Sequence, residues 1–256
     1  MKICFFANNS KNFDPNSGGV QRITRVLQSE FQSKNINVCL LSKRNEDEKI
    51  TYSDNEFTLP KKRVDDIENI RFVKDLIVKQ KIDVFINQDG FNSETLNLIR
   101  SISDQIKIVS AHHNCIACLY EKYKELFEYN RSKLFFDFVE KTHSWWLIML
   151  LYRIRQYFLW KKMLKYSDAV VLYFSSFEKE LKEITSIKSN KIKIIPNPAP
   201  FEISSELKTF NKRVVYVGRI IQNQKRIDLL LQLWKRLHQD FPDWQFDLVG
   251  DGAYMD

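Results

Sequence analysis

Short apolar runs alternate with amphipathic segments along almost the whole chain, and this alternation constrains the fold more than any other feature. None of these runs shows the polar–apolar alternation of a half-exposed strand, so both faces of each strand are expected to be buried. Between them, apolar residues recur at helical spacing, as Val20, Ile23 and Leu27 do. The pattern predicts an α/β fold with a doubly wound parallel sheet. The strands are expected at 2–7, 37–41, 83–87, 106–111, 169–174 and 191–195, with a further candidate at 56–59.

A proline-rich segment divides the chain into two unequal parts. Residues 196–200 read Pro-Asn-Pro-Ala-Pro, a run that interrupts regular structure. The length of 256 residues lies between one large domain and two ordinary ones. We expect a complete N-terminal Rossmann-like domain over residues 1–200. Residues 201–256 are expected to form the first β-α-β unit of a second Rossmann-like domain.

Composition excludes several classes of protein. The hydrophobic fraction of 44% and charged fraction of 28% are those of a soluble globular chain. The apolar run near the N-terminus is too short for a signal peptide, so we expect a cytoplasmic protein with reduced thiols. Neither a GxGxxG fingerprint nor a Walker GxxxxGK[ST] motif occurs. The lone pair Cys115 and Cys118 lacks the second pair of ligands that a zinc site needs.

Polar residues follow several of the expected strands, at the edge where parallel sheets bind ligands. Gly18 and Gly19 precede the first helix, whose N-terminus can hold an anion; a plain turn is the alternative. Asp89 follows strand 83–87, and His112 and His113 follow strand 106–111. Because successive strand residues point to opposite faces, only one histidine is expected to face a cleft.

A second cluster follows the apolar strand 214–217. Gly218 and Arg219 come directly after it, and Lys225 follows six residues later. A guanidinium fork and an ammonium group that converge beyond a glycine suit a pyrophosphate. The alternative is a surface turn with two solvated cations.

Taken in order, six segments of the chain resemble glycosyltransferase family 4, the retaining sugar-nucleotide enzymes of the GT-B fold. Together they cover essentially the whole chain. They are GGVQR at 18–22, HN at 113–114, SDAVV at 167–171, IIPNP at 194–198, VGR at 217–219 with Lys225, and LVGDG at 248–252.

The resemblance implies a nucleotide-diphosphate-sugar donor bound mainly by the C-terminal domain. Arg219 and Lys225 would bind the pyrophosphate and stabilise the leaving nucleoside diphosphate, a role that needs no metal or other cofactor. Gly218 would lie beside the same phosphates. Gly18 and Gly19 would approach them from the N-terminal domain.

The remaining roles concern the sugar and the acceptor. The resemblance implies that His113, rather than His112, contacts the donor sugar. It places a polysaccharide or lipid-linked acceptor on the N-terminal domain, where Asp89 and Arg22 are the acceptor-side candidates.

Two departures from the family pattern bear on activity. Family members continue well beyond the position of Asp251 and carry a Glu-x7-Glu motif there, and no such segment follows here. Arg226 also follows Lys225 where the family usually has glycine. We therefore expect a truncated C-terminal domain with impaired transfer. The alternative is a catalytically inactive remnant that binds the acceptor or a membrane.

The net charge of +8 is concentrated in one aromatic stretch. Residues 141–166 hold six lysines and arginines and no acidic residue, interleaved with tryptophans and leucines. A helix over 143–165 could lie on an anionic membrane surface, with some of Trp145, Trp146, Leu150 and Trp160 facing outward. Alternatively, its aromatic residues pack into the core. No nucleic-acid-binding motif accompanies the charge, so nucleic acid is not expected as a partner.

Overall fold

The computed structural model describes residues 1–7, 13, 18–44, 54–90, 92–117, 120, 133–198, 211–220 and 225–252. The chain divides into two compact units, Met1–Pro200 and Phe201–Asp256, and each is described by itself. The acceptor and donor roles that the sequence assigns to these units stay predictions.

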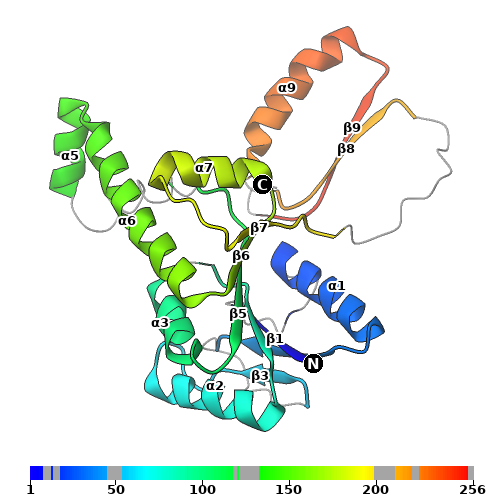
Figure 1. The fold of residues 1–256 in the computed structure, drawn as a ribbon. Helices are drawn as coiled ribbons and strands as arrows, with labels where there is room; N and C mark the ends of the chain where they lie inside the picture. The colour runs from blue at the N-terminus through cyan, green and yellow to red at the C-terminus, as the bar shows by residue number, and fades with distance from the viewer. Residues whose placement is uncertain are drawn as a thin grey trace. The chain divides into compact units, whose positions relative to one another are not determined.

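A seven-stranded, all-parallel sheet forms the centre of the first unit (Figure 1), in the order β3-β2-β1-β4-β5-β6-β7. Strands β1 and β4 are adjacent, with Cys4 opposite Phe85. Strands β2 and β3 lie on the β1 side of this pair, and β5, β6 and β7 lie on the β4 side. The doubly wound parallel sheet predicted from the sequence is confirmed. Its strands are β1 (Lys2–Ala7), β2 (Asn37–Ser42), β3 (Glu56–Thr58), β4 (Val84–Asn87), β5 (Lys107–His112), β6 (Ala169–Leu172) and β7 (Ile192–Ile194).

Both faces of β1 and β2 are covered, which explains why these strands are apolar at successive positions. Helix α1 packs on one face, where its Phe31 stacks on Phe5 of β1 with ring centroids 6.1 Å apart. The larger core cluster lies on the other face, beneath α2, α3, α6 and α7 (Figure 1). The helices are α1 (Gly19–Ser33), α2 (Ile67–Gln80), α3 (Ser93–Ile102), α5 (Lys133–Thr142), α6 (Trp145–Tyr166) and α7 (Ser175–Thr185).

Local capping decides where two helices begin, and it corrects one predicted boundary. The apolar pattern predicts a helix from Val64, but α2 begins at Ile67 because the Asp66 side chain accepts a hydrogen bond from the Glu68 N–H at 2.9 Å. Helix α6 begins after His143, whose φ of 51° ends the preceding helix. The predicted break near residues 129–130 lies outside the described residues.

The second unit contains strands β8 (Arg213–Val217) and β9 (Gln245–Val249) and helix α9 (Ile227–Asp240). The two strands pair in parallel, with Tyr216 opposite Leu248. Trp234 of α9 packs against Phe246 with ring centroids 5.3 Å apart. In the part of this unit that the structure describes, only Ile220 and Ile227 are buried apolar residues.

Candidate functional site

The carboxyl ends of β1 and β4 form the switch point of the first unit, where a doubly wound sheet leaves room for a ligand. Helix α1 starts beside this point, and the turn after β4 carries Gln88 and Asp89. Strand β5 ends next to β4, so His112 and His113 lie at the same edge. The fold thus brings Gly18, Gly19, Asp89 and His113 to one edge of the sheet.

Among the described residues, no side chain caps the backbone N–H groups at the N-terminus of α1. Gly18 is the N-cap residue, makes no side-chain cap bond, and no acidic residue lies in the first turn. A β-carbon at Gly19 would meet no atom within 4 Å, whereas one at Gly18 would lie 2.7 Å from Oε1 of Gln21. These two glycines therefore leave the helix terminus open, and its partial positive charge favours an anion.

The first turns of α1 bury polar side chains rather than apolar ones. Gln21 and Thr24 are both buried, and the Thr24 Oγ1 donates to Oε1 of Gln88 at 2.5 Å. This contact ties α1 to the end of β4. The sequence analysis missed these residues, because the apolar periodicity of α1 gives no reason to single out a threonine and a glutamine.

Asp89 is a largely buried carboxylate at this edge. Its Oδ2 accepts hydrogen bonds from the Asn92 side chain at 2.9 Å and from the Thr95 hydroxyl. Its Oδ1 is buried and finds no hydrogen-bond partner among the described residues. Burial raises the pKa of Asp89 to about 6, although the two donors and the nearby Lys43 act in the opposite direction.

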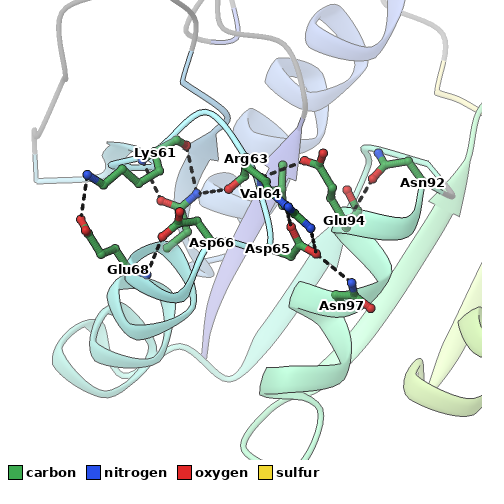
Figure 2. A network of polar contacts seen from close by, with 11 residues as sticks. Lys61, Arg63, Val64, Asp65, Asp66, Glu68, Asn92, Glu94 and Asn97 are labelled. Carbon is green, nitrogen blue, oxygen red and sulfur yellow. Dashed lines mark hydrogen bonds and ion pairs between the residues drawn. The ribbon is translucent and has the colours of Figure 1, made fainter.

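A polar network fixes the helix that carries the two donors to Asp89 (Figure 2). Glu94 of α3 accepts a hydrogen bond from the Val64 N–H at 3.0 Å, and Asn97 donates to Asp65 at 2.8 Å. Arg63 forms an ion pair with the same aspartate at 2.6 Å and lowers its pKa. The loop between β3 and α2 is therefore held against α3, on the side where Asn92 lies.

The two histidines point to different surroundings, as strand alternation predicts. His112 is buried and meets Trp160 edge to face, with ring centroids 5.3 Å apart. His113 is half-buried; its ring lies 4.7 Å from that of Tyr173, whose hydroxyl is 3.3 Å from Nε2. Burial lowers the pKa of each histidine to about 4, so both rings are neutral at neutral pH.

The segment after His113 is anchored by α7 and α6. The Glu180 carboxylate accepts hydrogen bonds from the Ile116 and Ala117 N–H groups at 2.9 and 3.1 Å. The buried Tyr152 hydroxyl donates to the carbonyl of Ile116. Cys115 is disulfide-bonded, which differs from the expectation of reduced thiols, whereas Cys4 and Cys39 are free.

In the second unit, glycines let the ends of β8 and β9 approach closely. The Gly218 N–H donates to the Val249 carbonyl at 3.0 Å, so the pairing continues past both strands. A β-carbon at Gly250 would lie only 1.8 Å from the Gly218 carbonyl oxygen. The glycine of the LVGDG segment is thus required for chain packing, a role that the sequence analysis did not assign.

Arg219 and Lys225 are both exposed near this junction. Arg226, which stands where the family pattern has glycine, adopts a left-handed conformation with φ 48°. Its guanidinium pairs with Asp228 at 3.1 Å. The position therefore favours glycine for conformational reasons. Whether Arg219 and Lys225 face Gly18 and Gly19 concerns both units and stays a prediction.

Arg22 is exposed on α1, one residue after the buried Gln21. Its acceptor-side role, like the roles of the other predicted site residues, stays a prediction. Among the described residues, no group of three His, Cys, Asp or Glu side chains could hold a metal ion.

Comparison with solved structures identifies the fold. Sucrose-phosphate synthase from Thermosynechococcus elongatus matches with a TM-score of 0.60 and 14% identity, over 98% of this chain. The chain spans 62% of the length of that synthase. At this identity the likeness concerns the fold, and the predicted GT-B-like class, with Rossmann-like α/β parts, is confirmed. No protein-family model and no curated protein sequence matches the chain.

Two other solved structures match at lower scores. An alpha-glucosyltransferase in complex with UDP and a 13-mer DNA has a TM-score of 0.47 and 12% identity, over 99% of this chain and 68% of its own. The UDP-GlcNAc 2-epimerase from Methanocaldococcus jannaschii has a TM-score of 0.46 and 12% identity, over 96% and 65%. Both scores are below 0.5, so the fold is assigned on the synthase alone.

Proposed function

We propose that this protein is a glycosyltransferase of family 4, which transfers a sugar with retention from a nucleotide-diphosphate donor. The observation that carries this proposal is where the resembling segments lie in the fold. Each of these segments but SDAVV lies at or after the carboxyl end of a parallel strand. His113, Pro196, Gly218 and Gly250 come one or two residues after the last residue of the strand, and a loop separates the strand from Gly18. Ligands bind at these ends in Rossmann-like sheets. The fold shared with the synthase supports the same class of enzyme.

In the proposed reaction, the bond between the sugar's anomeric carbon and the donor diphosphate breaks, and a bond to an acceptor hydroxyl oxygen forms. The proton of that hydroxyl passes to the leaving diphosphate. Negative charge then develops on the leaving diphosphate. Arg219 and Lys225 stabilise that charge, and electrostatic stabilisation of this kind needs no metal. The open N-terminus of α1 at Gly18 and Gly19 supplies a further positive end for the phosphates.

The neutral state of His113 defines what it can do for the donor sugar. With a pKa of about 4, its ring carries no charge at neutral pH. It therefore contacts sugar hydroxyls as a neutral hydrogen-bond partner, and Tyr173 sets its orientation. Asp89 and Arg22 are assigned to the acceptor, a polysaccharide or lipid-linked glycan used on the cytoplasmic side.

Nucleotide binding tests the proposal separately from turnover. Calorimetric titration with UDP, GDP and ADP should find one nucleotide that binds, and Arg219→Ala should weaken it by about 1.5–3 kcal/mol through loss of charge-assisted bonds. Lys235→Ala, an exposed cation on α9, is the matched control and should leave the affinity unchanged. No binding of any nucleotide, or equal losses in both variants, would contradict the donor assignment.

Transfer is then followed with the sugar of the nucleotide that binds. Proton NMR of the product should show the anomeric configuration of the donor. Inversion at the anomeric carbon would reject the family assignment while leaving the nucleotide site intact.

A further inference from the structure

Helix α6 is apolar on two opposite faces. Ile148, Tyr152, Trp160 and Met163 form its buried face and reach the core of the first unit. Of the four residues of which the sequence predicts some to face outward, Trp146 and Leu150 are exposed, whereas the ring of Trp160 is fully buried beside His112. A helix that is apolar all round is either enclosed by protein or meets an apolar phase.

The second apolar face is exposed. Trp146, Leu150, Ile154 and Phe158 follow one another at intervals of four residues, with 63, 46, 45 and 59% of their surfaces exposed. Residues four apart lie on the same side of a helix, so these side chains form one stripe about 18 Å long. We call these four residues the exposed stripe. Among the described residues, the end of α7 borders part of this stripe and leaves it exposed.

Helix α5, which precedes α6, also has exposed apolar side chains. Its Leu134 and Phe138 are exposed and four residues apart, as in the stripe. Figure 1 shows α5 and the beginning of α6 projecting away from the sheet. Apolar side chains on a projecting pair of helices can meet a broad surface without a clash from the rest of the unit.

Cations border the exposed stripe. Arg153, Arg155, Lys161, Lys162 and Lys165 are all exposed, and residues 141–166 hold no acidic side chain. Lys161 extends over the ring of Tyr157 at 4.8 Å, which places its ammonium group beside the aromatic surface. The partner of this face must therefore accept apolar side chains and carry negative charge.

A shallow groove of about 570 Å³ runs along the stripe, between α6 and the end of α7. Leu150, Ile154 and Phe158 line one side of it, and Ile184 lines the other. Arg153 spans the groove and donates to the Ile184 carbonyl at 3.0 Å. The groove is thus apolar along its length with a guanidinium at its rim.

We propose that the exposed stripe and its cations form a docking surface for an anionic phospholipid membrane. Within the described residues, no helix is long and apolar enough to cross a bilayer, so α6 lies along the membrane surface. The apolar stripe enters the region between headgroups and acyl chains, and the lysines contact lipid phosphates. This inference does not depend on the proposed transferase function.

Vesicle binding tests the docking surface with the full 256-residue chain. The protein should float with vesicles of phosphatidylglycerol and phosphatidylcholine but not with phosphatidylcholine alone. Raising salt from about 0.1 M to about 1 M should weaken binding, because it shortens the screening length from about 10 to 3 Å. Equal binding to neutral vesicles, or binding that salt does not change, would overturn the anionic selectivity.

Matched variants test which residues are responsible. Lys161→Gln with Lys162→Gln should lower partitioning about 25-fold, about fivefold per cation. Leu150→Gln with Ile154→Gln should lower it at least about tenfold. The controls are Arg71→Gln with Lys79→Gln for the cations and Val78→Gln for the apolar residues. These residues of α2 are also exposed and lie outside the surface. Thermal unfolding of each variant shows whether it is folded.

Trp146 supplies a spectroscopic readout of depth. Lipids brominated on their acyl chains should quench part of the tryptophan fluorescence, and Trp146→Phe should remove that quenching.

A second copy of this chain is the other occupant to consider. If the wild-type protein sediments as a dimer, the Leu150 and Ile154 variant is monomeric, and vesicles do not bind, the surface is a dimer interface and the membrane proposal is wrong.

Discussion

Replacing Asp89 with asparagine should change how the free energy of unfolding depends on pH. The pKa of Asp89 is about 6 in the folded protein, whereas an unperturbed aspartate titrates near pH 4. The folded state therefore binds more protons than the unfolded state between about pH 4 and 6. In that window the free energy of unfolding falls as pH rises, because ionised Asp89 is disfavoured by burial.

The magnitude follows from the two pKa values. One pKa unit corresponds to about 1.4 kcal/mol, so this carboxyl costs about 3 kcal/mol of stability at pH 8 relative to pH 4. Asparagine keeps an oxygen for the Asn92 and Thr95 donors. Its amide N–H group, however, takes the buried position of Oδ1, where an unmet donor costs about 1–3 kcal/mol.

The expected signature is a crossover between acid and alkaline conditions. Near pH 4 the variant should be about 1–3 kcal/mol less stable than the wild type, and near pH 8 equally stable or up to about 2 kcal/mol more stable. Urea unfolding followed by tryptophan fluorescence measures the free energy of unfolding of each protein at both pH values. Asp75→Asn, an exposed carboxyl on α2, is the control and should change neither value. A parallel pH dependence in wild type and Asp89→Asn would refute the buried-carboxylate reasoning.

Two further substitutions test packing at the strand ends. Gly250→Ala should separate the ends of β8 and β9 and destabilise the second unit by about 2 kcal/mol or more, because the new methyl would lie 1.8 Å from the Gly218 carbonyl oxygen. The new methyl of Gly19→Ala meets open space, so this substitution should stabilise α1 by about 0.5–1 kcal/mol. Equal effects of Gly250→Ala and Gly19→Ala on thermal unfolding would contradict this account. Glu180 anchors the segment after His113, so Glu180→Ala should lower the free energy of unfolding by about 2–3 kcal/mol and accelerate amide hydrogen exchange in that segment. Unchanged exchange would show that the anchor is dispensable.

The sheet could be predicted because its signal is local. Strands that are apolar at every position, such as 2–7, allow only burial on both faces, and helices between them favour parallel order. Apolar periodicity places the start of α2 at Val64, because Val64 continues the apolar period, whereas the capping residue Asp66 marks the observed start. A capping residue therefore locates the end of a helix better than periodicity does.

The surroundings of the site residues depend on contacts between distant segments, so the sequence could not reveal them. Tyr173 meets His113 across 60 residues, and Thr24 meets Gln88 across 64. The orientation of Trp160 was unreadable for another reason: α6 has apolar residues on all sides, so its periodicity does not distinguish the buried face from the exposed one. The order of strands places residues at an edge, whereas packing decides where each side chain points.

The double-faced character of α6 has a thermodynamic consequence for any partner. The side chains of Tyr152 and Trp160 lock the helix into the core, so its backbone is already ordered before anything binds to the opposite side. A partner of the exposed stripe therefore meets a rigid ridge and loses little conformational entropy on association. Because the same helix packs against β6, whatever holds this ridge also fixes the orientation of the whole sheet relative to that partner.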